Sequence, residues 1–274
     1  MSSIAFRTIL ILPAFILGCA FNPSLQSRYT ASDGFSFSHG FKKSCIKAGN
    51  FTLTTYVRLK QKNGFIHIYI EGDGVSWVSR EHLSKDPTPY EPMVLELASM
   101  DPVANVAYLA RPGQYGLAGH PDCDSAYWSN KRFSEEVIAS MNEAVSQLAM
   151  QAEAQHIELI GYSGGAAVAV LIAARRHDIA GLITIAGNLD PNAVNKIHHV
   201  SPLQGSLDPM TVAEKIRDIP QSHFVGAQDK TVPLAIARAF VHKEGIKDYK
   251  SIIVVADVSH AQGWRENWKA LNGF

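Results

Sequence analysis

A serine stands between two glycines where a short apolar run gives way to an alanine-rich stretch. Residues 157–160 are predicted to form a buried strand, residues 161–165 a tight G-x-S-x-G turn, and residues 166–176 a helix. Glycine is needed where strand and helix pass close together, because a side chain would collide there and only glycine adopts unusual dihedrals cheaply. This order predicts a strained turn that raises the Ser163 hydroxyl above a sheet. Similar turns also bind phosphate, so the motif indicates a catalytic serine only together with other catalytic residues elsewhere in the chain.

Strand-like and helix-like stretches alternate along the rest of the chain. Helices are predicted over 92–100 and 133–154, and strands over 51–59, 65–70, 103–109, 182–186, 223–226 and 251–256, with Asn63-Gly64 turning the first two strands into a hairpin. The later strands are continuous apolar runs, which is typical of a parallel sheet buried on both faces. The alternation predicts a doubly wound, mostly parallel α/β sheet with its chemistry at the carboxyl ends of the strands.

Two polar residues follow the last two predicted strands. Asp229 comes after the strand over 223–226, and His260 comes after the strand over 251–256. A serine becomes a good nucleophile when a base takes its proton and a third group orients that base. Ser163, Asp229 and His260 stand in the chain order of a hydrolase triad. Asp190 is the rival acid, whereas Asp257 lies too close to His260 in sequence.

These residues together resemble the α/β-hydrolase superfamily, over essentially all of the chain that follows the N-terminal apolar stretch. The G-x-x-D-x-x-V-P segment around Asp229 looks like the acid loop of that superfamily. More narrowly, the chain resembles poorly characterised bacterial lipoprotein serine hydrolases. The resemblance implies an α/β-hydrolase fold and a reaction class, and it does not imply a substrate. The segment over 188–221 is too short for a large lid, so we expect a small lid or none.

An oxyanion hole needs two backbone donors aimed at the developing charge. The first expected donor is the N–H of Gly164, directly after the nucleophile, and the second is the N–H of Asp73, in the loop after the strand over 65–70. The superfamily often carries His-Gly in that loop, and Glu71-Gly72 replaces it here. The hydrogen bonds that support the hole must therefore differ. Arg111 is expected to hold either a substrate carboxylate or a structural ion pair.

The N-terminal stretch has the composition of an export signal. Residues 8–17 are almost wholly apolar and too short to cross a bilayer comfortably, so residues 1–18 are interpreted as a signal peptide. Ile16-Leu17-Gly18-Cys19 resembles a lipobox, which makes Cys19 the expected lipidation site; cleavage after Ala20 is the alternative. We expect a tether over 19–34 and one catalytic domain over 35–274. The implied location is the bacterial cell envelope, on the periplasmic face of the outer membrane.

Charge and composition limit the partners. The chain has 25 Lys and Arg against 25 Asp and Glu, so no electrostatic argument favours nucleic acid. Its 11 histidines lack metal-ligand spacing, and no metal or other cofactor is expected. The predicted partners are a small acyl substrate and the membrane, contacted through the N-terminal lipid. After Cys19, two cysteines remain, Cys45 and Cys123, and the sequence leaves open whether they form a disulfide.

The sequence thus predicts a serine hydrolase that cleaves a carboxylic ester or a related acyl compound through an acyl-enzyme. Ser163 would attack the carbonyl carbon, His260 would transfer the proton, and Asp229 would orient the imidazole. Acyl transfer to an alcohol would use the same residues. An alternative from another class is a ligand-binding lipoprotein without catalysis, since a fold does not fix a function.

Overall fold

One eight-stranded sheet forms the centre of the protein, in the order β1-β2-β4-β3-β5-β6-β7-β8. The computed structural model describes residues 24–117, 123–246 and 249–272. Strands β1 and β2 form an antiparallel hairpin, β2 is antiparallel to β4, and every other neighbouring pair is parallel. The strands are β1 (Lys42–Ala48), β2 (Phe51–Leu59), β3 (Phe65–Ile70), β4 (Asn105–Leu109), β5 (His156–Tyr162), β6 (Ile179–Ile185), β7 (Gln221–Gly226) and β8 (Ile252–Val255).

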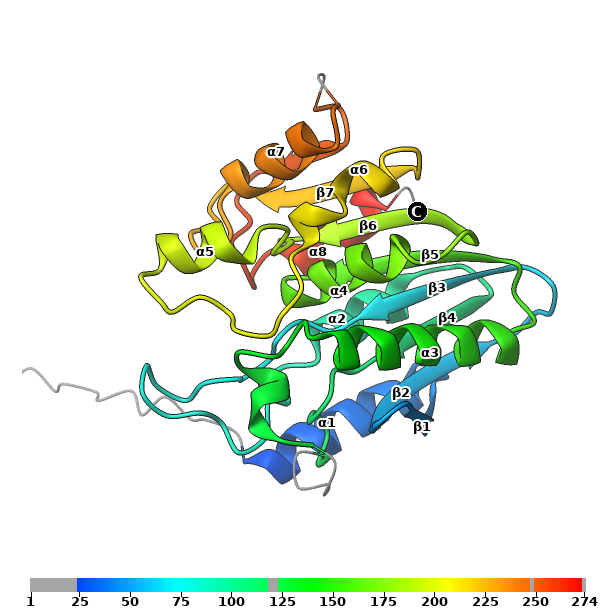
Figure 1. The fold of residues 1–274 in the computed structure, drawn as a ribbon. Coiled ribbons are helices and arrows are strands. Elements are labelled where there is room, and N and C mark those ends of the chain that lie inside the picture. Colours follow the sequence, from blue (N-terminus) through cyan, green and yellow to red (C-terminus); the bar gives the residue numbers. More distant parts are fainter. Residues whose placement is uncertain (1–23, 118–122, 247–248, 273–274) are drawn as a thin grey trace, which may run out of the picture.

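Helices cover both faces of this sheet, and each face has its own apolar core. Figure 1 shows the layers. One face is covered by α3 (Glu135–Gln151), α4 (Gly164–Ala173), α6 (Ala213–Ile216) and α7 (Leu234–Lys243). The other is covered by α1 (Leu25–Ser38), α2 (Met93–Met100) and α8 (Trp264–Leu271). Shorter elements are α5 (Pro191–Ile197), η1 (Ser125–Trp128) and η2 (Pro209–Thr211).

The predicted doubly wound, mostly parallel sheet is confirmed. The central strands β4, β5, β6 and β7 and the helices α2 and α3 lie within a few residues of their predicted positions. The burial of these strands explains the agreement, since every residue of β4 is buried and a strand covered on both faces must be apolar throughout. Because the strands from β3 to β8 are parallel, their carboxyl ends share one edge of the sheet, toward which the β3 and β7 arrows point in Figure 1.

The hairpin predicted around Asn63-Gly64 is wrong. Strand β4 lies between β2 and β3, so these two strands are not neighbours. The hairpin that does form joins β1 to β2 through Gly49, whose φ of 51° suits a tight turn that glycine adopts at low cost. The sequence of β1, with three lysines in KKSCIKA, concealed an edge strand that is exposed over much of its length.

The tether predicted over 19–34 is wrong from residue 25 onward, because α1 occupies that stretch. The hydroxyl of Ser24 accepts a hydrogen bond from the Ser27 N–H and caps the helix. The helix has little apolar periodicity; polar contacts such as the 3.0 Å bond from Arg28 to the Thr88 carbonyl hold it on the domain. Tertiary contacts rather than helical propensity thus order this segment. The folded part of the chain therefore includes residues 25–34.

Some sequence-based expectations concern the N-terminal residues that the structure does not describe. The predicted signal peptide over 1–18 and the lipidation site Cys19 lie outside the described residues. No helix in the described part of the chain is both long and apolar enough to span a bilayer.

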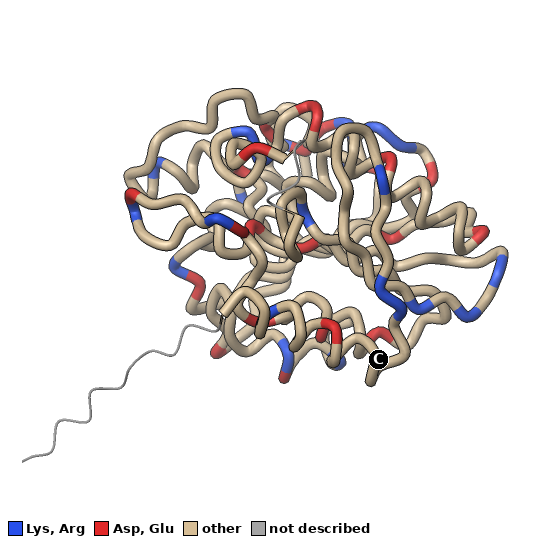
Figure 2. Tube along the Cα trace, turned by 90° about the horizontal axis from the view of Figure 1, so that it is seen from below, with Lys and Arg blue, Asp and Glu red and all other residues tan. Residues whose placement is uncertain are grey.

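Cys45 on β1 is exposed and Cys123 is half-buried, and both are free thiols. Acidic and basic positions are mixed over the face shown in Figure 2, in keeping with the balanced formal charge.

Candidate active site

Ser163 lies at the turn between β5 and α4, in the strained conformation that the motif predicts. Its φ is 50° and its ψ is −117°, a region that side chains rarely occupy. Added Cβ atoms show why the flanking glycines are there: one at Gly161 would lie 2.5 Å from the Ala166 Cα, and one at Gly165 would lie 2.3 Å from the Ile70 carbonyl oxygen. The turn therefore needs glycine at both positions.

The structure brings Ser163, His260 and Asp229 together. His260 Nε2 lies 3.1 Å from Ser163 Oγ, and His260 Nδ1 lies 2.9 Å from Asp229 Oδ2. Asp229 Oδ1 also accepts the backbone N–H groups of Thr231 and Val232, each at 2.8 Å. The carboxylate of Asp229 is buried, so it can fix the imidazole while both of its oxygens are satisfied.

The loops that carry the acid and the histidine are packed against each other. The Gln228 N–H donates to the Val258 carbonyl at 2.9 Å, and a Cβ on Gly226 would lie 2.4 Å from the same oxygen. The His260 carbonyl accepts the Trp264 indole N–H at 2.8 Å and the Tyr162 hydroxyl at 3.1 Å. The orientation of His260 is therefore set by its backbone as well as by Asp229.

The rival acids serve other purposes. The Asp190 side chain caps α5 by accepting the Ala193 N–H at 2.9 Å. Asp257 accepts the Gln228 side-chain amide at 3.2 Å. His260 bonds to neither, so the geometry selects Asp229 as its carboxylate partner.

The predicted oxyanion donors lie on adjacent segments. Gly164 is the first residue of α4, so its N–H is among those a helix leaves without an intrahelical acceptor. Asp73 follows β3 and lies directly against Gly164: a Cβ added there would be 2.0 Å from Asp73 Oδ1. The loop after β3 and the start of α4 thus meet beside Ser163.

Two arginines hold the Asp73 carboxylate. Asp73 Oδ1 lies 3.4 Å from Arg111 Nη1, and Asp73 Oδ2 lies 3.1 Å from Arg132 Nε. Both guanidinium groups lie over the Phe133 ring. Burial lowers the pKa of Arg111, and the Asp73 charge opposes that shift. Of the two roles considered for Arg111, the structure shows the ion pair.

Glu71 occupies the position where the superfamily often has histidine. Its Oε1 accepts the Gly72 N–H at 2.8 Å, and its Oε2 accepts the Tyr108 hydroxyl at 2.9 Å. Tyr108 in turn lies 2.9 Å from the Tyr115 hydroxyl. Burial raises the pKa of Glu71 to about 7, against the lowering effect of these donors. A buried carboxyl therefore supports the oxyanion loop in place of an imidazole.

A pocket of about 360 Å³ opens onto Ser163 and His260. Its other walls come from the loops after β3 and before α2 and from the start of α8, with Tyr90, Tyr162 and Arg265 among the lining residues. Tyr162 could have been found from the sequence as the variable residue of G-x-S-x-G, whereas Tyr90 and Arg265 carry no signal. No described residue between β6 and β7 lines the pocket, in keeping with a small lid or none.

None of the tryptophans in the described residues lines this pocket. Trp128 and Trp264 are buried, and Trp77 is 46% exposed. A second cavity of about 380 Å³ lies among α1, α2 and α8. Arg265 lines both cavities, whereas Ser163, His260 and Asp229 do not line the second one.

Solved structures similar to this chain are α/β hydrolases and esterases. The esterase Pf2001 of Pyrococcus furiosus superposes with a TM-score of 0.61 at 15% identity, covering 87% of this chain and 92% of that one. Est1E from Butyrivibrio proteoclasticus gives 0.58 at 13% identity, over 85% and 96%. An alpha-beta serine hydrolase homologue from Coxiella burnetii gives 0.55 at 16% identity, over 85% and 94%. No protein-family model and no curated protein matches the chain. The likeness establishes the α/β-hydrolase fold.

Proposed function

We propose that the chain is a serine hydrolase that cleaves carboxylic esters or related acyl compounds. The observation that carries the proposal is the hydrogen-bonded line from Ser163 Oγ through His260 to Asp229, beside a pocket of substrate size. A hydroxyl, an imidazole and an oriented carboxylate are the parts that acyl transfer through serine requires.

The reaction follows from that geometry. Ser163 Oγ attacks the carbonyl carbon while His260 Nε2 takes its proton, and the Gly164 and Asp73 N–H groups stabilise the oxyanion. His260 then gives the proton to the leaving alcohol, and the C–O bond to the alcohol breaks. Water repeats the sequence on the acyl-enzyme, releases the acid and restores the serine. Asp229 keeps the imidazole in the required tautomer throughout.

The proposal includes anchoring in the bacterial envelope through a lipid on Cys19, at the periplasmic face of the outer membrane. Its support is the lipobox-like Ile16-Leu17-Gly18-Cys19 segment. The test is incorporation of a labelled fatty acid into the expressed chain, with Cys19→Ser as the matched control. Equal labelling of both chains would contradict the assignment of Cys19.

The activity is tested with p-nitrophenyl esters of graded acyl length and the full chain purified in detergent. Ser163→Ala is expected to lower kcat on the order of 10⁶-fold, because the three residues act as a unit. The chain-length profile would measure the acyl pocket, and product analysis with added alcohol would reveal acyl transfer. Folded protein that neither hydrolyses esters nor reacts with a fluorophosphonate would favour the ligand-binding alternative.

A further inference from the structure

Helix α1 begins beside the pocket. Ser24 caps α1, and one turn later Arg28 donates to the Thr88 carbonyl at 3.0 Å. The Arg28 guanidinium also lies over the Tyr90 ring, 4.1 Å from its centroid. Tyr90 lines the same pocket as Ser163. The start of α1 therefore lies near the mouth of the pocket.

A small antiparallel ribbon, residues 76–84, leads into Asp86 and Thr88, which accept hydrogen bonds from Tyr29 and Arg28 of α1. An isolated bridge joins Trp77 to Leu83 across the ribbon. At its base the Val75 N–H donates to the Pro87 carbonyl at 3.0 Å, and Val75 itself lines the pocket. The 76–84 ribbon is thus held in a defined position at the pocket mouth.

Large apolar side chains are exposed on the ribbon and around it. Trp77 is 46% and Val78 61% exposed, and Leu25 and Tyr90 are also exposed. We call these four residues the apolar rim. The other tryptophans, Trp128, Trp264 and Trp268, are buried. An exposed tryptophan next to an exposed valine is typical of a surface that contacts another apolar phase, and tryptophan favours the membrane–water interface.

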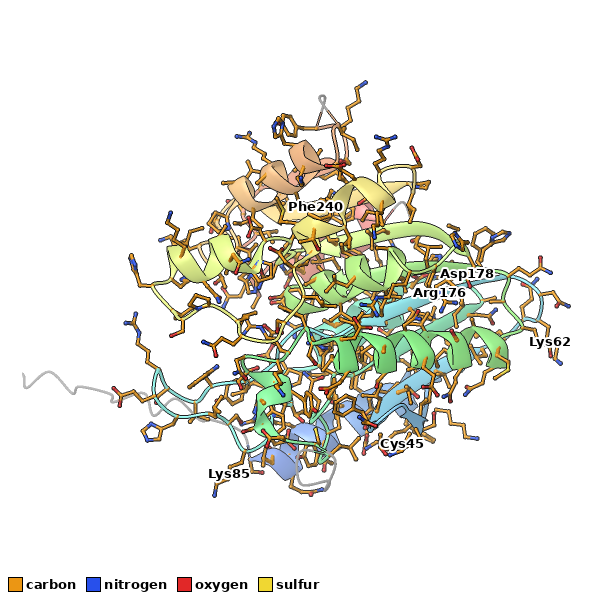
Figure 3. All side chains as sticks on the ribbon, viewed as in Figure 1. Cys45, Lys62, Lys85, Arg176, Asp178 and Phe240 are labelled. Atoms are coloured by element: carbon orange, nitrogen blue, oxygen red, sulfur yellow. The ribbon has the colours of Figure 1, made fainter. Side chains whose placement is uncertain are left out.

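The length of chain between the expected anchor and the domain selects which face meets the membrane. Fully extended, the stretch from Cys19 to Ser24 spans at most about 18 Å, whereas a domain of this size is roughly 45 Å across. Figure 3 shows Lys85, in the segment that follows the ribbon, near the start of α1, and Lys62 at the opposite side of the molecule. A lipid on Cys19 would therefore hold the apolar rim, and not the opposite edge, against the bilayer.

We propose that the apolar rim docks onto the phospholipid bilayer to which Cys19 anchors the chain, so that the pocket takes acyl-lipid esters lying in that leaflet. The docking is independent of catalysis, and the substrate class rests on the proposed hydrolase function. Because α1 is held against the domain from Leu25 onward, only residues 20–24 separate the proposed anchor from the domain.

Charge contributes little to this docking. On the ribbon and beside it, the exposed Arg80 and Lys85 flank the exposed Glu81. Glu91, at the pocket edge, pairs with Arg265 at 2.8 Å. The contact is therefore mainly apolar, and its dependence on salt and on anionic lipid should be weak.

The docking is tested with the full lipidated chain in vesicles of phosphatidylcholine and phosphatidylglycerol in equal parts, with bromine on the acyl chains as the quencher. We expect quenching of the Trp77 emission, and its loss in Trp77→Phe, whose remaining tryptophans are buried. The same quenching should persist in pure phosphatidylcholine. Absence of Trp77 quenching, or failure of the full chain to float with the vesicles, would overturn the docking whatever the activity.

The substrate class is tested with paired variants. Trp77→Ser/Val78→Ser is expected to lower hydrolysis of a vesicle-embedded diacyl phospholipid about tenfold or more, and to leave turnover of a water-soluble short-chain ester unchanged. Phe65→Ser/Met150→Ser is the matched control: both side chains are exposed, by 54% and 72%, and Phe65 begins β3 at the opposite edge of the sheet. It should change neither rate.

The outcomes separate the two proposals. Quenching of Trp77 in a chain that hydrolyses no ester would support the docking and overturn the hydrolase. Quenching with turnover of soluble esters but none of the phospholipid would support the docking and overturn the acyl-lipid substrate. Equal losses in both pairs of variants would show a general loss of folding or membrane binding and contradict the role of the apolar rim.

Discussion

The two walls of the pocket hold their functional groups by different means. On the wall with Ser163, short turns and direct hydrogen bonds place the side chains, as in the 2.9 Å contact between His260 and Asp229. On the opposite wall, ionisable groups removed from water do so: Glu71 is buried, and Asp73 is held by the buried Arg111. The first wall depends on steric fit and on the hydrogen bonds of Asp229 and His260, and the second depends on the balance of buried charge. Changes on the two walls should therefore have different signatures.

The largest effect is expected from the acid on the first wall. Asp229→Asn keeps the shape but favours the wrong imidazole tautomer, so kcat should fall on the order of 10⁴-fold. Asp190→Asn, whose side chain caps α5, should leave kcat nearly unchanged. Steady-state kinetics on both variants tests the assignment, and the reverse ranking would show that Asp190 is the acid.

This first wall was largely predictable from the sequence. Glycine at 161 and 165 has a steric cause that sequence alone reveals, and the carboxyl ends of β7 and β8 fix where Asp229 and His260 must lie. Central strands were found for a similar reason, because burial on both faces leaves only apolar residues.

The second wall and the N-terminal helix were not predictable in the same way. Asp73 pairs with Arg111 and Arg132, which lie far from it in the sequence, and no local pattern joins the three residues. Glu71 was recognisable as a departure from the histidine that the superfamily often has in this loop. Its hydrogen bond to Tyr108, however, depends on the register of β3 and β4. Helix α1 is polar and is held by tertiary contacts, so periodicity could not reveal it.

The next effect concerns the charge cluster on the second wall. Arg111→Met removes one of the two cations at Asp73, and the free energy of unfolding should fall by roughly 1.5–3 kcal/mol because the Asp73 carboxylate, which is 24% exposed and keeps Arg132, loses a charged hydrogen-bond donor. Arg175→Met is the matched control, since its pair with Glu135 lies at the surface and should contribute less than about 1 kcal/mol. Urea denaturation measures both. Equal losses of unfolding free energy in the two variants would show that the pair between Asp73 and Arg111 contributes no more than a surface ion pair.

A third prediction addresses the junction of the walls. Gly164→Ala would place its Cβ 2.0 Å from Asp73 Oδ1, so the carboxylate must leave Arg111 and Arg132, and the loop that carries the Asp73 N–H donor loses that support. Loss of one oxyanion donor lowers kcat roughly 10²–10³-fold. In an Asp73→Ala background the same substitution should cost less than about tenfold, because the obstructing carboxylate is gone. Gly181→Ala, which meets only the flexible end of Glu158, should leave kcat unchanged. If the losses of kcat from Gly164→Ala and Asp73→Ala were additive, a direct contact between residue 164 and the Asp73 carboxylate would be contradicted.

The last effect is a pH dependence to which Glu71 on the second wall contributes. The pKa of Glu71 is raised to about 7, above its ordinary value of 4.5, so the folded protein binds more protons than the unfolded chain between these values. The free energy of unfolding should therefore fall by roughly 3 kcal/mol as the pH rises through that window, and Glu71→Gln should abolish this component.

Glu244 provides the control that separates stability from catalysis. Burial also raises its pKa to about 7, but it lies at the end of α7, away from the pocket. Glu244→Gln should flatten the stability profile in a similar way without altering the pH dependence of kcat/KM. In Glu71→Gln the ratio of kcat/KM to that of the wild type should rise several-fold from about pH 6 to about pH 8, because ionised Glu71 opposes the developing oxyanion. A flat ratio would show that Glu71 supports the loop without its charge reaching the reacting atoms.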